Sequence, residues 1–207
     1  MKTVKILIAT NNKNKAREFS EIFGKENFNN IETLMLSDIG FFDEIVEDAD
    51  TFEGNSLIKA RAGASVGYTC IGDDSGLMVD ALDGEPGIYS ARYAGCGHDD
   101  SANNRKLLAR MKDVPIDKRT AKFVCCISCA FPNGDSFTVR GECNGRILFK
   151  EQGKGGFGYD PLFYVDKYAK TFAELSSDEK NSVSHRGRAA ELFIKKFIEY
   201  IKENNIC

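Results

Sequence analysis

VKILIA, residues 4–9, is a continuous apolar run that only Lys5 interrupts. Such a run is typical of a buried strand that opens an α/β fold, because a strand covered on both faces is apolar throughout. The polar segment TNNKNK follows it at once, and residues 16–23 then place three aromatic and aliphatic side chains on one helical face. The beginning of the chain therefore predicts a strand, a polar turn and a helix, in that order.

Strand and helix patterns alternate along the rest of the chain. Strands are expected at residues 31–36, 68–72, 122–131 and 137–149, helices at 55–66 and 103–111, and loops at 41–50 and 84–97. The dipeptide Asn133-Gly134 is a strong hairpin signal, and Ser184 caps a final helix that runs to about Glu203. This order predicts one α/β domain, residues 1–207, built on a mixed sheet that helices cover.

The composition is that of an ordinary globular protein. Hydrophobic residues make up 42% of the 207 residues and charged residues 29%, with a formal net charge of −3. That charge gives no general attraction to nucleic acid or to anionic lipid, so neither is expected as a partner. The seven cysteines suit core thiols in a reducing compartment, and no apolar run is long enough for a signal segment or a membrane span. We expect a soluble, cytoplasmic protein.

The first polar cluster lies between the opening strand and its helix, and it consists of Thr10, Asn11, Asn12, Lys13, Asn14 and Lys15. A helix N-terminus offers backbone N–H groups and the positive end of the helix dipole, and the lysines add charge, so this cluster suits a phosphate. It is not a Walker loop, because the chain contains no GxxxxGK segment. An Asn-rich helix cap with solvated lysines is the structural alternative.

The second cluster, Asp73-Asp74-Ser75-Gly76, is expected where an apolar strand ends. Neighbouring side chains of a strand point in opposite directions and like charges repel, so two adjacent carboxylates need an explanation there. One of them could bind Mg²⁺ together with substrate phosphate oxygens, and it could take a proton from an attacking water. A solvated Asp-Ser-Gly turn is the alternative.

Two further clusters lie in the C-terminal half of the chain. The segment GGFGYDP, residues 155–161, sets one phenylalanine among glycines that allow close backbone approach, and that ring could stack on a flat base. Lys180 and the segment Ser184-His185-Arg186 bring together hydrogen-bond donors that could read a keto oxygen. The alternatives are a glycine-rich hairpin with core aromatics and an exposed basic helix start. The other histidine, His98, is expected at the surface.

Taken together, these parts are what a nucleotide hydrolase needs, and the sequence resembles the noncanonical purine nucleoside triphosphate pyrophosphatases, the inosine triphosphatases. The resemblance covers nearly the whole chain. It rests on the segments ATNNKNK, TFEGNSLIKAR, GDDSGLMVDALDGEPGIYSARYAG, GGFGYDPLF and KNSVSHRGRA, in this order. It implies an α/β fold with a long, curved mixed sheet flanked by helices, and two lobes around a central nucleotide-binding cleft. It also implies a homodimer.

The resemblance further implies an activity and a role for each cluster. The enzyme would use Mg²⁺ to hydrolyse ITP, dITP and XTP to the monophosphate and pyrophosphate, which removes them from the nucleotide pool. Residues 10–15 and Lys59 would hold the triphosphate, Asp74 would be the general base and a Mg²⁺ ligand, and Ser75 would contact the substrate. The base pocket would consist of Phe157, Gly158, Tyr159 and Asp160, with Phe157 stacking on the base. The purine edge would be recognised by Lys180, His185 and Arg186.

This chain departs from the family pattern at two positions. Gly54 stands where the family usually has a metal-binding Glu, immediately before the residue that is Asn55 here. Glu53, one place earlier, is the candidate replacement as a metal ligand. Asn11 stands where many members have Gly, which changes a side chain beside the phosphates.

Two other interpretations stay open at this point. A septum-formation-type nucleotide pyrophosphatase would share the architecture, but SHRG and FGYDP disfavour it. A catalytically silent nucleotide-binding module is disfavoured by the presence of Asp73, Asp74 and Lys15, whereas Gly54 keeps that interpretation open.

Overall fold

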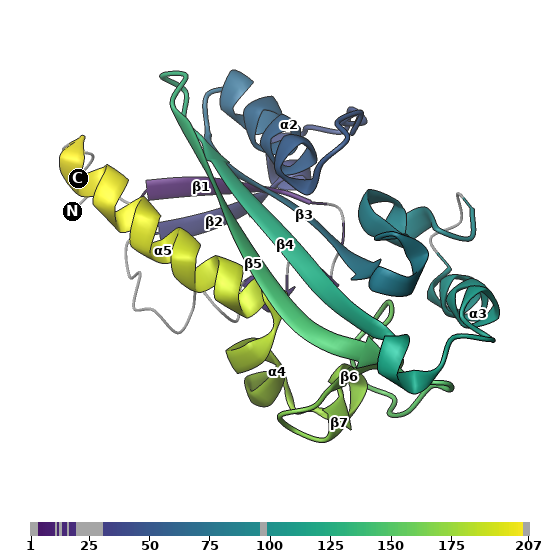
Figure 1. Ribbon diagram of the computed structural model, residues 1–207. Helices are drawn as coiled ribbons and strands as arrows, with labels where there is room; N and C mark the ends of the chain where they lie inside the picture. Colours follow the sequence, from purple (N-terminus) through teal and green to yellow (C-terminus); the bar gives the residue numbers. More distant parts are fainter. Residues whose placement is uncertain are drawn as a thin grey trace. The chain divides into compact units, whose positions relative to one another are not determined.

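The computed structural model describes residues 4–10, 12, 14–15, 17–19, 31–95 and 99–204 (Figure 1). The chain forms two compact units. Unit 1 comprises Met1–Asp74, Cys125–Gly141 and Arg186–Cys207, and unit 2 comprises Ser75–Val124 and Glu142–His185. The predicted helix at 16–23 is helical at residues 17–19, and its remainder lies outside the described residues, as does His98.

Seven strands form one mixed sheet in the order β2-β1-β3-β4-β5-β6-β7. Strand β1 pairs in parallel with both β2 and β3, whereas β6 pairs antiparallel with β5 and β7. The strands are β1 Val4–Ala9, β2 Ile31–Met35, β3 Thr69–Val79, β4 Thr120–Ala130, β5 Ser136–Ile147, β6 Phe163–Val165 and β7 Lys170–Thr171. The mixed sheet flanked by helices is therefore confirmed, and so is the hairpin turn at Asn133-Gly134 between β4 and β5.

The helices begin close to the predicted positions because polar side chains cap them. Thr51 accepts from the Gly54 N–H at the start of α2, Asp99 accepts from the Ala102 N–H at the start of α3, and Ser184 precedes α5. The helices are α2 Phe52–Ser65, α3 Asp100–Arg110, α4 Ser177–Val183 and α5 His185–Glu203. No helix in the described part of the chain is long and apolar enough to cross a membrane.

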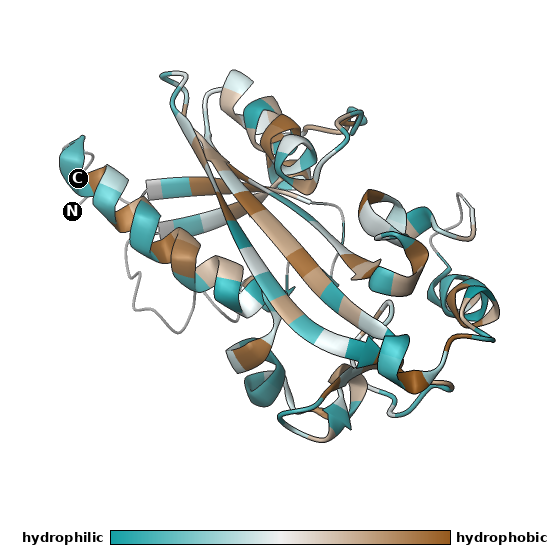
Figure 2. Ribbon diagram, viewed as in Figure 1, coloured by the Kyte–Doolittle hydropathy of each residue, from teal (hydrophilic) through white to brown (hydrophobic). Residues whose placement is uncertain are grey.

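Unit 1 is built on alternation along its strands. On one face, Ile6 and Ile8 of β1 pack with Ile71 of β3, three residues of β4 and the apolar stripe of α5. Figure 2 shows that stripe as brown bands between hydrophilic segments of the helix. On the other face, Leu7 and Ala9 pack with Cys70 and Leu36, and α2 covers them. Helices α5 and α2 thus cover opposite faces of the unit 1 sheet, as a doubly covered parallel pair requires.

The described cysteines lie in the interior, four of them in unit 1 and Cys143 in the core of unit 2. Cys70, Cys125, Cys126, Cys129 and Cys143 are buried thiols, as predicted. Burial raises the pKa of the Cys70 thiol to about 12, and it also raises the pKa values of Cys126 and Cys129. These thiols act as small apolar groups in the core.

Unit 2 has its own core, in which Leu107 of α3 and Met111 directly after it meet aromatic side chains of the strands and of the C-terminal loops. Phe123, Phe163 and Phe172 form a cluster with ring centroids 4.7 to 5.7 Å apart. At the end of α3, the buried Arg119 guanidinium donates to four backbone carbonyls, those of Met111, Val114, Ile147 and Leu148. Unit 2 is therefore held together by aromatic packing and by one buried cation on backbone oxygens.

One local prediction is wrong. The strand that was expected to end before Asp73 continues to Val79, so both carboxylates lie inside β3 rather than at its end. Asp73 is 2% exposed and Asp74 is 7% exposed. A strand can hold two buried carboxylates when cations face them on both sides, and the contacts of this strand supply those cations.

Candidate functional site

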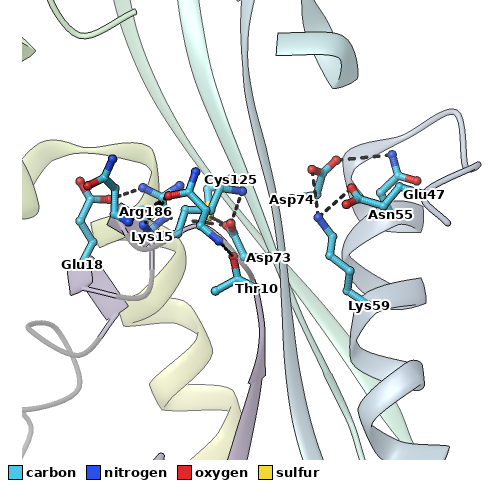
Figure 3. Close-up of polar contacts among 12 residues, drawn as sticks. Thr10, Lys15, Glu18, Glu47, Asn55, Lys59, Asp73, Asp74, Cys125 and Arg186 are labelled. Atoms are coloured by element: carbon cyan, nitrogen blue, oxygen red, sulfur yellow. Dashed lines mark hydrogen bonds and ion pairs between the residues drawn. The ribbon is translucent and has the colours of Figure 1, made fainter. Parts of the chain in front are cut away.

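The centre of the candidate site in unit 1 is the pair of adjacent carboxylates on β3. Because successive strand residues point to opposite faces, Asp73 and Asp74 lie on different sides of the strand (Figure 3). Asp73 faces Lys15 and Arg186, whereas Asp74 faces Lys59. The two adjacent carboxylates of the motif therefore lie in two separate environments with different cations.

On its side of the strand, Asp73 is tightly neutralised. It forms an ion pair with Lys15, its Oδ2 lies 3.8 Å from Arg186 Nε, and the Cys125 thiol donates to it at 3.1 Å. Burial by itself would raise the pKa of Asp73, but Lys15 and Arg186 outweigh burial and hold the pKa well below its ordinary value. Asp73 is therefore an anionic anchor for two cations.

Arg186, which was predicted to read the purine edge, is fixed in the interior of unit 1. It is 2% exposed, and its guanidinium forms an ion pair with Glu18 besides the contact with Asp73. Burial opposes its charge, but Asp73 and Glu18 outweigh burial and raise its pKa. Its charge is therefore balanced by two carboxylates within unit 1.

On the other side of the strand, Asp74 shares one lysine with a second carboxylate. Lys59 Nζ lies 3.4 Å from Asp74 Oδ1 and 2.8 Å from Glu47 Oε2. Asn55 connects Asp74 to the loop that carries Glu47. Its amide nitrogen lies 3.5 Å from Asp74 Oδ2, and its amide oxygen accepts from the Ala49 N–H of that loop at 3.0 Å. Figure 3 shows Glu47, Asn55 and Lys59 gathered around Asp74.

The electrostatic balance at Asp74 is opposite to that at Asp73. Burial raises the pKa of Asp74, Lys59 only partly offsets this effect, and the negative charges of Asp73 and Glu47 add to it. The pKa of Lys59 is raised, because its ion pairs with Asp74 and Glu47 outweigh the effect of burial. Asp74 is thus a buried carboxylate of increased basicity beside a firmly charged lysine, which suits a general base.

A close helix–strand approach places Lys59 against Asp74. Gly72 lies directly under α2, where a Cβ atom would collide with the Ser56 carbonyl oxygen and would lie 2.6 Å from the Ala60 nitrogen. Glycine at this position lets the backbone of α2 approach β3. Lys59 therefore reaches the carboxylate two residues further along the strand.

The polar cluster after β1 forms a capped helical turn. The Thr10 hydroxyl accepts from the Asn12 N–H at 3.1 Å, and Asn12 Oδ1 accepts from the N–H groups of Asn14 and Lys15 at 3.0 and 3.1 Å. This is the N-cap arrangement. Asn11 and Lys13, two of the predicted phosphate ligands, lie outside the described residues.

Glu53, the candidate metal ligand, lies against Arg140, whose Nη1 is 2.7 Å from Glu53 Oε1. Burial would raise the pKa of Glu53, but the contacts with Arg140 lower it. Within the described ranges, no three His, Cys, Asp or Glu side chains are grouped so that they could hold a metal ion. Asp74 and Glu47 both contact Lys59, and that Glu53 binds metal stays a prediction.

In unit 2, the predicted base-pocket residues form one hydrogen-bonded group. Asp160 Oδ2 accepts from the Phe157 N–H at 3.0 Å and from Lys180 Nζ at 2.7 Å. Lys180 is 7% exposed, and its Nζ lies 4.9 Å from the centroid of the Phe157 ring. The structure thus brings together Phe157, Asp160 and Lys180 as a wall of one aromatic ring backed by a buried ion pair.

The other predicted residues of unit 2 have different surroundings. His185 is 5% exposed and stacks on Phe123 with ring centroids 4.7 Å apart. The buried Tyr159 hydroxyl donates to the Ser90 carbonyl at 2.8 Å, so this ring supports the loop from behind. Ser75 lies in β3 directly after Asp74 and is partly exposed.

Sequence reasoning missed Glu47 and Glu18 as members of the unit 1 site. Glu47 belongs to the acidic stretch at 41–50, which was predicted only as a loop. Its position just before the capped start of α2 was an available signal. Glu18 gave no such signal, because a single glutamate on a short helix is ordinary at the surface.

Fold and site together define an α/β protein whose central strand carries two carboxylates held by separate cations. The chain belongs to the Ham1 family, whose sequence profile matches residues 6–196. It is 48% identical over 198 residues to the dITP/XTP pyrophosphatase of Bacillus cereus, covering 94% of this chain and 95% of that protein. It is 49% identical over 189 residues to the dITP/XTP pyrophosphatase of Geobacter sulfurreducens, covering 91% and 94%.

Solved structures of the same family have the same fold. The Ham1 protein of Staphylococcus aureus superposes with a TM-score of 0.83 at 41% identity, covering 94% of this chain and 98% of that chain. The HAM1 protein of Coxiella burnetii gives 0.85 at 35% identity, with 95% and 99% covered. The resemblance that the motifs indicated is thereby confirmed.

Proposed function

We propose that this chain hydrolyses noncanonical purine nucleoside triphosphates, dITP, ITP and XTP among them, to the monophosphate and pyrophosphate. The observation that carries this proposal is the buried, basic Asp74 beside Lys59, in a chain that belongs to the Ham1 family. Its relatives at nearly half identity are named dITP/XTP pyrophosphatases. In a cell, this reaction would remove such nucleotides from the pool.

In this mechanism Asp74 takes a proton from the attacking water as the water oxygen bonds to the α-phosphorus. The bond from that phosphorus to the oxygen bridging to the β-phosphate breaks, and pyrophosphate leaves. Lys15 and Lys59 would exchange a carboxylate partner for phosphate oxygens, which supports charge on the leaving group. Both lysines are already held in place by ion pairs with Asp73, Asp74 or Glu47.

The residues around Lys59 fit Mg²⁺. This ion needs only one or two carboxylates, with water and substrate phosphates completing its shell. The carboxylates of Asp74 and Glu47 both contact Lys59 Nζ, and their mutual repulsion helps to raise the pKa of Asp74. When bound there, Mg²⁺ would stabilise the negative charge that develops on the phosphate oxygens.

Unit 2 would supply recognition of the base. Phe157 would stack on the purine ring, with Lys180 and His185 as candidate donors to its edge. Hypoxanthine and xanthine carry a keto acceptor at position 6 where adenine carries an amino donor. Donors aimed at that position would pair with the first two bases and would face a donor in adenine, so adenine would leave buried groups unsatisfied.

A pyrophosphate-release assay with a nucleotide panel tests this proposal. Inosine, deoxyinosine and xanthosine triphosphates should give pyrophosphate in the presence of Mg²⁺, and adenosine triphosphate should give much less. Orthophosphate produced without an added pyrophosphatase, or full turnover in excess EDTA, would contradict it. Binding of ITP without any product would indicate the silent binding module instead.

Two further properties complete the proposal. We expect a homodimer, so sedimentation at micromolar concentration should give about twice the 22.9 kDa of the single chain. A mass near the single-chain value would contradict this expectation. A cytoplasmic location is proposed on the strength of the buried thiols, which suit a reducing compartment.

A further inference from the structure

Helix α3 holds the loop that carries Phe157 through both backbone polar groups of Gly158. Asp100 Oδ2 accepts from the Gly158 N–H at 2.7 Å. One turn further along the helix, Asn104 Nδ2 donates to the Gly158 carbonyl at 3.1 Å. The two successive peptide groups that flank the Gly158 Cα are therefore oriented by an acceptor and a donor from one helix.

The loop needs this support because its backbone is unusual. Gly156 and Gly158 both have positive φ, 71° and 61°, a conformation that glycine adopts without strain. Because these two residues have no side chains, the loop has few side chains of its own to pack. Phe157 lies between them and is only half-buried. Without outside contacts, a loop of this composition would sample several ring positions.

The helix side of the contact is rigid. Asn104 is 2% exposed, and the neighbouring Asn103, also 2% exposed, accepts from the Ala94 N–H at 2.7 Å and donates to the Ala91 carbonyl at 3.2 Å. The first turns of α3 are thus fastened to the preceding segment as well as to the Phe157 loop. On the far side of Phe157, Asp160 accepts from its N–H.

We infer that Asp100 and Asn104 are positioning residues for base recognition: they fix the backbone on both sides of Gly158 and thereby the orientation in which the Phe157 ring meets the purine. This inference rests on the proposed function, in which Phe157 stacks on the base. It assigns α3 a part in substrate selection although neither residue was implied by the family motifs. Neither residue takes part in the chemical step.

The expected signature is a loss of affinity for the base without a loss of affinity for phosphate. Base stacking on an aromatic ring is a large share of the affinity, so a misplaced ring should weaken binding of inosine monophosphate by roughly 10- to 100-fold. Tripolyphosphate, which has no base, should inhibit as it does in the wild type. For ITP, KM should rise by roughly tenfold while kcat stays within about threefold.

Three variants separate positioning from stability. Asn104→Leu keeps the size of the side chain and removes the donor to Gly158. Asp100→Asn keeps an acceptor for the Gly158 N–H and should restore most of the affinity that Asp100→Ala loses. Asp99→Ala is the matched control, because Asp99 caps the same helix through the Ala102 N–H without contacting Gly158.

The measurements are binding of inosine monophosphate by calorimetry, inhibition by tripolyphosphate, and kcat and KM for ITP, each on the full chain after circular dichroism confirms folding. Selective loss of monophosphate binding in Asn104→Leu and Asp100→Ala, with Asp99→Ala near wild type, is the expected result. Wild-type monophosphate affinity in both variants, or an equal loss in Asp99→Ala, would overturn the inference. If Asn104→Leu does not fold, the Asp100 series decides alone. A wild-type chain that releases no pyrophosphate would instead refute the proposed function.

Discussion

Asp73 and Asp74 are neighbours in sequence, yet folding changes their pKa values in opposite directions. Asp73 has two cations and a thiol donor around it, so the folded state favours its ionised form. Asp74 is buried and shares Lys59 with Glu47, so burial outweighs its one ion pair and the folded state disfavours its ionised form. Ionisation of Asp73 therefore stabilises the fold, whereas ionisation of Asp74 is retained at a cost in stability, as is common for catalytic groups.

The first prediction compares the two asparagine variants. Asp73→Asn should reduce the free energy of unfolding at pH 7 by about 3–5 kcal/mol, because it leaves Lys15 and Arg186 buried without their shared anion. Asp74→Asn should change it by less than about 1 kcal/mol, in the stabilising direction. Urea unfolding of the two variants beside the wild type measures both. Equal destabilisation would contradict the difference in environment.

The pH dependence of this comparison has a definite sign. The stability from Asp73 is present above its unfolded pKa of about 3.9 and is lost as the pH falls through its lowered folded pKa. For Asp74 the raised folded pKa gives stability that is present below the unfolded pKa and is lost as the pH rises through the folded pKa. The advantage of Asp74→Asn over the wild type should therefore shrink as the solution is acidified.

The second prediction concerns catalysis by Asp74. Asp74→Asn should lower kcat by roughly 10²–10⁴, the range for losing a general base, while ITP binding falls much less. The variant should also lack the acid limb of kcat/KM that titration of Asp74 gives the wild type. A variant with nearly wild-type kcat would contradict the assignment of Asp74 as the general base and would make Asp73 the next candidate.

At the scale of elements, hydropathy and turn chemistry predicted most of the fold. The apolar run of β1, the Asn133-Gly134 turn and the amphipathic α5 carry their signals locally. The course of β3 through Asp73 and Asp74 was not predictable, because the cations that make it possible come from α2, from α5 and from Lys15. Charged residues inside a strand are read correctly only when their partners are known.

The site was predictable to the same extent. The motifs and the family resemblance singled out Asp74, Lys59, Phe157 and Lys180, and the structure places Asp74 beside Lys59 in unit 1 and Phe157 beside Lys180 in unit 2. Their roles in the reaction stay predictions. The carboxylate that would bind the metal was harder to predict. Gly54 stands where the family usually has a metal-binding Glu, so the sequence pointed to Glu53, one place earlier. The loop before α2 brings Glu47 to Lys59, a contact that only the folded chain shows, and this makes Glu47 a second candidate for that carboxylate.

The third prediction separates these two glutamates. Glu47→Gln should raise the Mg²⁺ concentration that gives half-maximal turnover by roughly tenfold or more, the scale of losing one group of a metal site. Glu53→Gln should leave that titration unchanged, since the Glu53 carboxylate is already paired with Arg140. Loss of this half-exposed ion pair should also change the stability of the fold very little. The reverse result would restore Glu53 as the metal ligand.

At the scale of the whole molecule, the path of the chain links the two units more closely than a linker would. The chain passes between units inside regular elements, after Asp74 in β3, after Val124 in β4 and after Gly141 in β5. A boundary between independent domains normally falls in an exposed, flexible segment. Here each of these three passages lies inside a strand, and a fourth passage follows His185 at the start of α5. Unfolding of one unit would therefore disrupt strands that continue into the other.

The last prediction follows from this continuity. Thermal unfolding should show one cooperative transition, with near-ultraviolet circular dichroism, far-ultraviolet circular dichroism and calorimetry giving the same midpoint. Asp73→Asn, which acts in unit 1, and Asn104→Leu, which acts in unit 2, should each shift that single midpoint without splitting it, because both units share β3, β4 and β5. A second transition in either variant would mean that the units unfold separately. In that case residues 1–207 would have to be described as two domains.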